Sequence, residues 1–126
     1  MQTIRSLIVD DEKFSRVSLK KLLKPYSQIE IVDEAADGLQ AIEKIEARKP
    51  DLVFLDIQMP GLNGFELLRG LTIKPKPQFI FVTAFDQYAV KAFEVNAIDY
   101  LLKPIDEARL QQAIGKLNDN GRAIAE

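Results

Sequence analysis

Short apolar runs alternate with amphipathic segments five times along the chain. The apolar runs are expected as strands and occupy residues 4–10, 30–35, 52–56, 79–83 and 97–103. Several of them are continuous rather than alternating, a pattern typical of strands that are buried on both faces of a sheet. The pattern therefore predicts a sheet whose two faces are both covered.

The segments between the runs have the periodicity of amphipathic helices. Helices are predicted at 13–24, from a cap at 37–38 onward, at 64–71, at 86–95 and at 106–117. Pro25 ends the first of them, because proline cannot continue a helix. The predicted apolar faces include Leu39, Ile42 and Ile45 in the second helix and Ala89, Ala92 and Phe93 in the fourth.

The last predicted helix has the clearest signal. Leu110, Ala113, Ile114 and Leu117 recur at the spacing of one helix face. Asp106 is the expected N-cap of this helix.

Alternation of strands and helices indicates an α/β fold in which helices cross between parallel strands. Five strand–helix units are too few for a closed barrel, which needs eight. They fit the flavodoxin-like (βα)5 arrangement, a doubly wound five-stranded parallel sheet with strand order 2-1-3-4-5.

Size and composition narrow the classes of function. The chain has 126 residues, the size of one domain, and a net charge of −2, which gives no reason to expect binding to nucleic acid. It contains no cysteine and no histidine, which excludes disulfides, thiolate or imidazole zinc sites, a Ser-His-Asp triad and a phosphohistidine carried by this chain. No apolar stretch is long enough to span a bilayer, and the first residues lead directly into a strand. We therefore expect no signal peptide, no membrane association and a cytoplasmic location.

Polar side chains follow four of the apolar runs, at the point where each run ends. Asp10 and Asp11 follow the first run, Asp56 the third, Thr83 the fourth and Lys103 the fifth. The carboxyl ends of parallel strands meet at one edge of a sheet, where α/β proteins bind their ligands. These side chains are therefore expected to form one site.

Three carboxylates at one edge repel one another and favour a bound cation or a proton. Oxygen ligands without histidine or cysteine favour Mg²⁺, Mn²⁺ or Ca²⁺. With Lys103, a divalent cation makes the site neutral. Such a cation attracts phosphate, and a carboxylate can itself attack phosphorus.

On this reasoning the acidic residues have different roles. Asp56 is the phosphoryl acceptor, because it follows the predicted central strand, while Asp10 and Asp11 hold the metal. The Gln58 backbone carbonyl is a further expected ligand. Lys103 and the Thr83 hydroxyl neutralise and hold the phosphoryl oxygens.

Each of these residues also has a purely structural interpretation. An acidic residue at a strand end is commonly a turn former or a helix cap. Asp10 or Asp11 alone would more often be structural than functional. The coincidence at four strand ends favours a site.

The same motifs resemble those of response regulator receiver domains. They are Asp10-Asp11, the segment from Asp56 to Gly61 together with Gly64, Val82-Thr83-Ala84, and the segment from Tyr100 to Pro104. They occur in the family's order over roughly residues 4–117. The resemblance implies a receiver domain at 1–118, followed by a polar tail or linker at 119–126.

The segment from Thr83 to Tyr100 is similar to the LytTR subclass of these regulators. Receivers of that subclass usually precede a DNA-binding domain. The chain would then be either an isolated receiver or the receiver of a longer regulator that controls transcription through an output domain not in this chain. The receiver itself is expected to bind no nucleic acid.

The resemblance also implies specific roles at the site. Asp56 would accept a phosphoryl group from the phosphohistidine of a sensor histidine kinase. Asp11, Asp56 and the Gln58 carbonyl would bind Mg²⁺, or Mn²⁺, directly, and Asp10 would act partly through water. The domain would be a signalling module with slow autodephosphorylation rather than an enzyme.

Further roles concern the switch. Thr83, Ala84 and Lys103 would contact the phosphoryl group, and the bond before Pro104 would be cis. After phosphorylation Thr83 would move inward and Tyr100 would turn into the vacated space.

Two further expectations concern hydrolysis and the output face. Gln58 and Phe85 lie where water must approach the phosphoryl group, so they are expected to tune its loss. A homodimer through the fourth helix, the fifth strand and the last helix is one hypothesis, with charged contacts from Lys91, Glu94, Asp99, Glu107 and Arg109; a simple solvated surface is the alternative.

Two other functions remain alternatives. An aspartate-nucleophile phosphatase of the haloacid dehalogenase type also uses Asp, Thr, Lys and Mg²⁺, but its nucleophile follows the first strand in an Asp-x-Asp motif that Asp10-Asp11-Glu12 lacks. A phosphate-independent interaction module would not need Asp11, Asp56, Thr83 and Lys103 to be intact.

Overall fold

The computed structural model describes residues 3–117, which form five strands and five helices. The strands are β1 (Ile4–Val9), β2 (Ile29–Ala35), β3 (Leu52–Leu55), β4 (Gln78–Thr83) and β5 (Asp99–Leu102). The helices are α1 (Lys13–Leu23), α2 (Gly38–Arg48), α3 (Gly64–Gly70), α4 (Ala89–Glu94) and α5 (Glu107–Gly115). The predicted tail at 119–126 lies outside the described residues.

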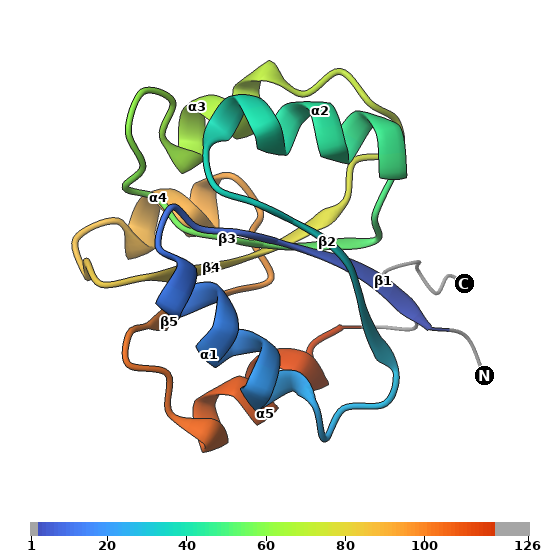
Figure 1. The fold of residues 1–126 in the computed structure, drawn as a ribbon. Coiled ribbons are helices and arrows are strands. Elements are labelled where there is room, and N and C mark those ends of the chain that lie inside the picture. Colours follow the sequence, from blue (N-terminus) through green and yellow to red (C-terminus); the bar gives the residue numbers. More distant parts are fainter. Residues whose placement is uncertain (1–2, 118–126) are drawn as a thin grey trace.

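The five strands form one parallel sheet with the order β2-β1-β3-β4-β5 (Figure 1). This confirms the predicted doubly wound, flavodoxin-like fold. The strand order changes direction beside β1, so the loops after β1 and β3 lie next to each other at the carboxyl edge.

The helices cover both faces of the sheet, as the continuous apolar strands predicted. In Figure 1, α2 and α3 lie on one side of the sheet and α1 and α5 on the other. Two apolar cores result, one containing Ile45, Phe65 and Phe81, the other Leu19, Phe54 and Leu110. Ala92 joins α4 to the first core.

Two predicted caps are confirmed by side-chain hydrogen bonds. The Asp37 carboxylate accepts from the Gln40 backbone N–H at 2.8 Å, which caps α2. The Asp106 carboxylate accepts from the Arg109 N–H at 3.1 Å, which caps α5. Each cap satisfies a donor that the first helical turn leaves without a partner.

The region around α4 and β5 differs from the prediction. α4 and β5 are shorter than the expected 86–95 and 97–103. Asn96 has a φ of 65° and closes α4, and the Ala97 N–H donates to the Ala92 carbonyl, so the chain turns before β5 begins. Residues before Ala89 form a loop at the carboxyl edge instead of a helical turn.

Two predicted core positions are also wrong. Leu39 and Phe93 are exposed, at 73% and 62% of their surface. Leu39 lies in the first turn of α2, and Phe93 faces away from the side of α4 that buries Ala92. Helical spacing identifies an apolar stripe, but only the packed neighbours decide which of its members are covered.

Within residues 3–117, no helix is long and apolar enough to cross a membrane. The Lys103–Pro104 peptide bond is cis in the structure. So is Lys74–Pro75, for which the sequence carried no signal.

Candidate functional site

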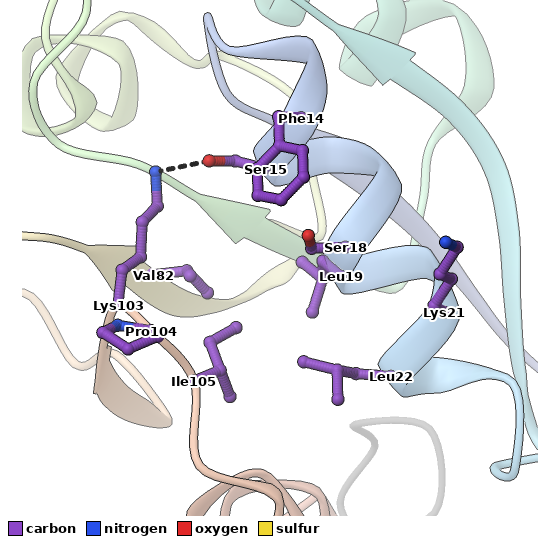
Figure 2. Close-up of a pocket in the computed structure, with 10 residues that line it drawn as sticks. All are labelled: Phe14, Ser15, Ser18, Leu19, Lys21, Leu22, Val82, Lys103, Pro104 and Ile105. Carbon is purple, nitrogen blue, oxygen red and sulfur yellow. Dashed lines mark hydrogen bonds between the residues drawn. The ribbon is translucent and has the colours of Figure 1, made fainter.

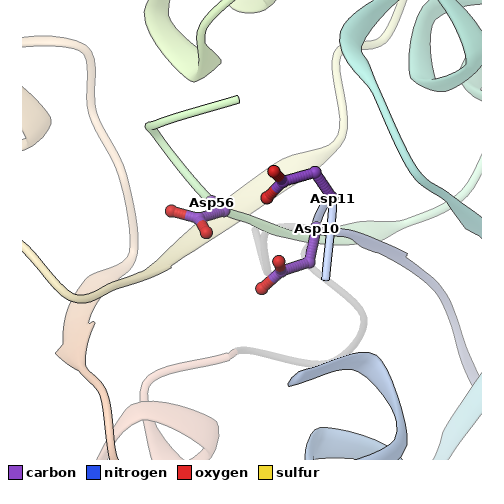
Figure 3. A group of neighbouring side chains, drawn as sticks. All are labelled: Asp10, Asp11 and Asp56. Atoms are coloured by element: carbon purple, nitrogen blue, oxygen red, sulfur yellow. The ribbon is translucent and has the colours of Figure 1, made fainter. Parts of the chain in front are cut away.

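Three carboxylates converge at the carboxyl edge of the sheet (Figure 3). Asp10 and Asp11 follow β1 and Asp56 follows β3, and one oxygen from each lies within 4.8 Å of the others. Asp10 and Asp56 are buried, with exposed fractions of 4% and 6%, whereas Asp11 faces solvent. The cluster is therefore buried on the side of Asp10 and Asp56 and open to solvent on the side of Asp11.

Backbone hydrogen bonds extend the sheet to these residues. The Asp10 N–H donates to the Ala35 carbonyl at 3.0 Å, and the Asp56 N–H donates to the Val9 carbonyl at 3.0 Å. Both bonds continue strand pairings of β1, so the sheet itself places the two acidic residues side by side.

Lys103 provides the positive charge of the cluster. Its Nζ lies 2.7 Å from the Asp10 carboxylate and 3.0 Å from that of Asp56, and it donates to the Ser15 hydroxyl at 3.2 Å. The Lys103 N–H donates to the Thr83 carbonyl at 2.9 Å, which continues the β4–β5 pairing. The structure thus brings together residues from the ends of β1, β3 and β5.

The loop after Asp56 folds tightly against it. The Ile57 N–H donates to Asp56 Oδ1 at 2.7 Å, and the Gly64 N–H donates to the Ile57 carbonyl at 2.9 Å. A Cβ at Gly64 would lie 2.8 Å from the Asp56 carbonyl oxygen, so any other residue would push α3 away from the site. Asn63 and Glu66 form a capping box that starts α3 at this point.

Burial and charge set the electrostatics of the cluster. Burial raises the pKa of Asp56, the nearby Asp10 charge raises it further, and Lys103 opposes both without reversing the shift. Burial alone would lower the pKa of Lys103, but hydrogen bonds to Asp10 and Asp56 raise it above its usual value. One ammonium therefore compensates two buried carboxylates incompletely.

The predicted switch residues lie at the end of β4 and on β5. Thr83 is fully buried, and the Phe85 N–H donates to its hydroxyl at 3.4 Å. The Tyr100 hydroxyl donates to the Phe85 carbonyl, so Tyr100 contacts the loop after β4. The Tyr100 ring packs against Phe81, and Ala84 is exposed at the start of the loop.

The loop residues near the site contact one another. Phe85 is partly exposed, at 39%, and packs edge-on against Tyr88. The Gln58 side-chain amide donates to the Tyr88 hydroxyl at 2.8 Å, which joins the loops after β3 and β4.

Ser15, Arg16 and Tyr88 also contact the site, although none of them was predicted as a site residue. Ser15 contacts Lys103, and the Arg16 guanidinium donates to the Asp10 carbonyl. Both residues lie in the first turns of α1, which begins shortly after Asp10 and Asp11. This closeness in the sequence could have identified them as neighbours of the site. Tyr88 carried no such signal, because its contact with Gln58 depends on the loop conformation.

One predicted surface contact is wrong. Asp99 is only 3% exposed and forms ion pairs with Arg109 at 2.9 Å and Lys116 at 3.0 Å within the same chain. Its carboxylate is therefore committed to holding α5 on β5 and is not available for a charged contact across a dimer.

A groove of about 540 Å³ opens beside the site, between α1 and the segment after β5 (Figure 2). Its walls are mainly apolar and include Phe14, Leu22 and Ile105. Lys103 and Ser15 lie at one end of it and are hydrogen-bonded to each other. The groove therefore leads from the surface of α1 to the ammonium that contacts Asp56.

The donor set fits a hard divalent cation. Three carboxylates offer oxygen ligands, two of them are held by the sheet, and exposed Asp11 leaves one side open to water. Mg²⁺ keeps several waters and is usually bound by one or two carboxylates, which matches this arrangement.

Comparison with known proteins gives a consistent result. Residues 6–115 match the model of the response regulator receiver domain. A response regulatory protein of Vibrio cholerae and the transcriptional regulatory protein BtsR of Escherichia coli are each 48% identical over 114 residues, which is 90% of this chain and 48% of the relative. This chain therefore spans about half the length of these curated relatives.

Solved structures agree with this result. The response regulatory domain of mrkE from Klebsiella pneumoniae superposes with a TM-score of 0.82 at 38% identity, over 90% of this chain and 93% of that one. A chain of the CheX-CheY-BeF3-Mg complex from Borrelia burgdorferi superposes with a TM-score of 0.79 at 28% identity, over 90% of this chain and 87% of that one.

Proposed function

The chain belongs to the response regulator receiver family, and we propose that Asp56 is its phosphoacceptor, which takes a phosphoryl group from the phosphohistidine of a sensor kinase. Receiver domains of response regulators are signalling domains of two-component systems. The assignment of Asp56 is supported above all by one contact: Lys103 Nζ lies 3.0 Å from the Asp56 carboxylate inside a buried acidic cluster. This ammonium is placed to neutralise charge on a phosphoryl group carried by Asp56.

In the proposed reaction an Asp56 carboxylate oxygen attacks the phosphorus atom of the donor. The bond between phosphorus and the donor imidazole nitrogen breaks, the nitrogen retains the electron pair, and the product is an acyl phosphate on Asp56. Hydrogen bonds from the Ile57 N–H to Oδ1 and from Lys103 to Oδ2 hold the carboxylate during attack. The Thr83 hydroxyl and the Ala84 N–H are proposed to contact the phosphoryl oxygens.

A bound Mg²⁺, or Mn²⁺, would neutralise the phosphoryl oxygens and lower the barrier to transfer. We assign Asp11, Asp56 and the Gln58 carbonyl as its direct ligands and Asp10 as a ligand through water. The structural relative crystallised with BeF3 and Mg is compatible with this assignment.

The apolar groove beside α1 is the proposed docking site of the kinase. A phosphohistidine must approach Asp56 closely, and the groove ends at Lys103 and Ser15, beside which Phe14 is 81% exposed (Figure 2). An apolar helix face laid into this groove brings its histidine to the acidic cluster. Phe14→Ala should therefore slow transfer from the kinase and leave phosphorylation by acetyl phosphate unchanged.

The switch is proposed to run from Asp56 through Thr83 to Tyr100. The acyl phosphate carries more negative charge than the carboxylate and attracts the Thr83 hydroxyl. Thr83 and Tyr100 are linked through Phe85, whose N–H contacts one and whose carbonyl contacts the other. Movement of Thr83 would therefore release the Tyr100 hydroxyl from the loop and change the surface of α4 and β5.

We propose that this surface forms a homodimer when Asp56 is phosphorylated. Val90 and Phe93 lie three residues apart on α4 and are 72% and 62% exposed, and Leu102 on β5 is 46% exposed. These apolar groups, flanked by Lys91 and Glu94, offer a self-complementary patch for a second copy of the chain.

The output is proposed to be transcription, as in the LytTR subclass. The relative named transcriptional regulatory protein BtsR extends well beyond the matched region, because the match covers 48% of it. On this view residues 1–118 form the receiver, and residues 119–126 lead toward a DNA-binding domain.

The test is incubation with acetyl phosphate and Mg²⁺, followed by measurement of the intact mass. We expect one phosphoryl group per chain, no adduct without Mg²⁺ and no adduct in Asp56→Asn. Asp51→Asn, which changes an acidic residue at the opposite end of β3, is the matched control and should still take the adduct.

The same experiment separates the alternatives. Rapid release of many phosphate molecules per chain would favour the phosphatase. Absence of any adduct in the wild-type chain would favour a phosphate-independent interaction module.

A further inference from the structure

Arg16 lies next to the acidic cluster without pointing into it. Its Nη1 donates to the backbone carbonyl of Asp10 at 2.8 Å, and its Nε donates to the Glu34 carboxylate at 3.0 Å. The Arg16 side chain is mostly buried, at 16% exposed, and Glu34 on β2 also pairs with Lys20. Arg16 therefore links β2 to the turn that carries Asp10 and Asp11, through one hydrogen bond to each.

The contact with the Asp10 carbonyl has a geometric consequence. That carbonyl belongs to the peptide unit between Asp10 and Asp11, and a peptide unit is planar and rigid. Holding its oxygen therefore fixes the direction in which the chain enters Asp11. Asp11 needs this support, because its carboxylate is exposed and, within residues 3–117, no hydrogen bond to it is found.

Asp10 is anchored by other groups as well. Its Oδ1 accepts from the Glu12 N–H at 3.0 Å, and its Oδ2 contacts Lys103 at 2.7 Å. These bonds orient the Asp10 side chain, whereas Arg16 holds the peptide that follows it.

We propose that Arg16 is a positioning residue of the cation site, which holds the Asp10–Asp11 peptide so that the Asp11 carboxylate faces Asp56. This inference rests on the proposed function, because it assumes that the three carboxylates bind Mg²⁺. Residues behind the direct ligands of a metal site commonly set its affinity in this way.

The charge of Arg16 and its hydrogen bond to the Asp10 carbonyl are expected to have opposite effects on the affinity for Mg²⁺. Arg16 is a cation near a site for a cation, so removing its charge alone would strengthen Mg²⁺ binding. Removing its hydrogen bond to the Asp10 carbonyl frees the peptide and weakens binding.

The experiment is a Mg²⁺ titration of the unphosphorylated full chain, followed by the backbone amide NMR shifts of Asp11 and Asp56. We expect Arg16→Met to weaken Mg²⁺ binding about tenfold, the lower end of the effect of losing such a supporting residue. Arg16→Lys keeps the charge but not the planar fork that spans Asp10 and Glu34, so it should also weaken binding.

Lys20→Met is the matched control. It removes a cation that pairs with the same Glu34 carboxylate and makes no contact with Asp10 among the described hydrogen bonds. It should leave the Mg²⁺ affinity unchanged or slightly higher.

Unchanged or tighter binding in Arg16→Met overturns the proposal, and so does an equal loss in Lys20→Met. If Arg16→Met does not fold, an unchanged affinity in Arg16→Lys overturns it. If the wild-type chain binds no Mg²⁺, the metal assignment of the proposed function is wrong as well. If the wild-type chain binds Mg²⁺ and Arg16→Met binds it with the same affinity, only the role of Arg16 is wrong.

Discussion

Lys103→Met tests the charge balance of the site. Nζ lies 2.7 Å from one buried carboxylate and 3.0 Å from another, those of Asp10 and Asp56. At an effective dielectric constant of about 20, each contact is worth about 6 kcal/mol before desolvation. Burying the ammonium costs several kcal/mol. Because methionine leaves two buried like charges without the ammonium that compensates them, we expect a net loss of about 2–4 kcal/mol in the free energy of unfolding.

The loss should depend on pH. The folded-state pKa of Asp56 is raised by burial and by Asp10, and Lys103 is among the groups that hold it down. Its removal raises this pKa further. In the unfolded chain the pKa of an aspartate is about 3.9. Between this value and the raised pKa, the folded state of the variant binds more protons than its unfolded state. The free energy of unfolding of the variant therefore falls as pH rises through the raised pKa. The deficit should be larger at pH 8 than at pH 5.

Mg²⁺ should reduce the deficit, because a divalent cation replaces the missing positive charge. The measurement is urea unfolding followed by far-ultraviolet circular dichroism, at both pH values, with and without Mg²⁺. Mg²⁺ should stabilise Lys103→Met more than wild type, since binding to the folded state alone adds directly to its stability.

Lys44→Met is the control for loss of a lysine in an ion pair. Lys44 lies 3.2 Å from Asp33 on the surface, at 36% side-chain exposure, and such pairs contribute up to about 1 kcal/mol. The control should show no change in the response to Mg²⁺. A Lys103→Met variant that is as stable as wild type at pH 8 and equally responsive to Mg²⁺ would contradict the compensating role of Lys103.

Three further outcomes are expected. Asp99→Asn should lose about 2–3 kcal/mol in the free energy of unfolding at pH 7, measured by urea unfolding. Burial raises the pKa of Asp99, but hydrogen bonds from groups that include Arg109 and Lys116 lower it below its usual value. The deficit of the variant should therefore vanish as pH falls from about 3.9 through the lowered pKa. Phe85→Ala should change the rate at which phosphorylated protein loses its phosphoryl group, followed by intact mass, and an identical time course counts against a role for Phe85. Beryllofluoride with Mg²⁺ should convert monomer to dimer in sedimentation velocity, and a chain that stays monomeric rules out the phosphorylation-dependent dimer.

The fold could be predicted because its signals are local. Continuous apolar runs such as 52–55 identify strands buried on both faces, and the crossover rules then leave few arrangements of five strands. The caps Asp37 and Asp106 act within their own helical turns, so they too were visible in the sequence.

Other features depend on which distant segments meet. Leu39 and Phe93 have helical spacing like that of core residues but are exposed, because no neighbouring element within residues 3–117 covers them. Asp99 was expected on the surface as a dimer contact. It is buried because α5 brings Arg109 and Lys116 over it, a contact between separate elements.

Three acidic residues, a threonine and a lysine stand at the ends of apolar runs, and this much can be read directly from the amino-acid order. Parallel strands must bring such ends to one edge, so a shared site followed from the local pattern and the geometry of sheets. The distribution of charges at this edge, in contrast, depends on contacts between separate elements of the fold. Lys103 compensates both Asp10 and Asp56, and Arg16 holds the peptide before Asp11, because the packing of α1 on the sheet and the pairing of β5 with β4 set distances that no local pattern encodes.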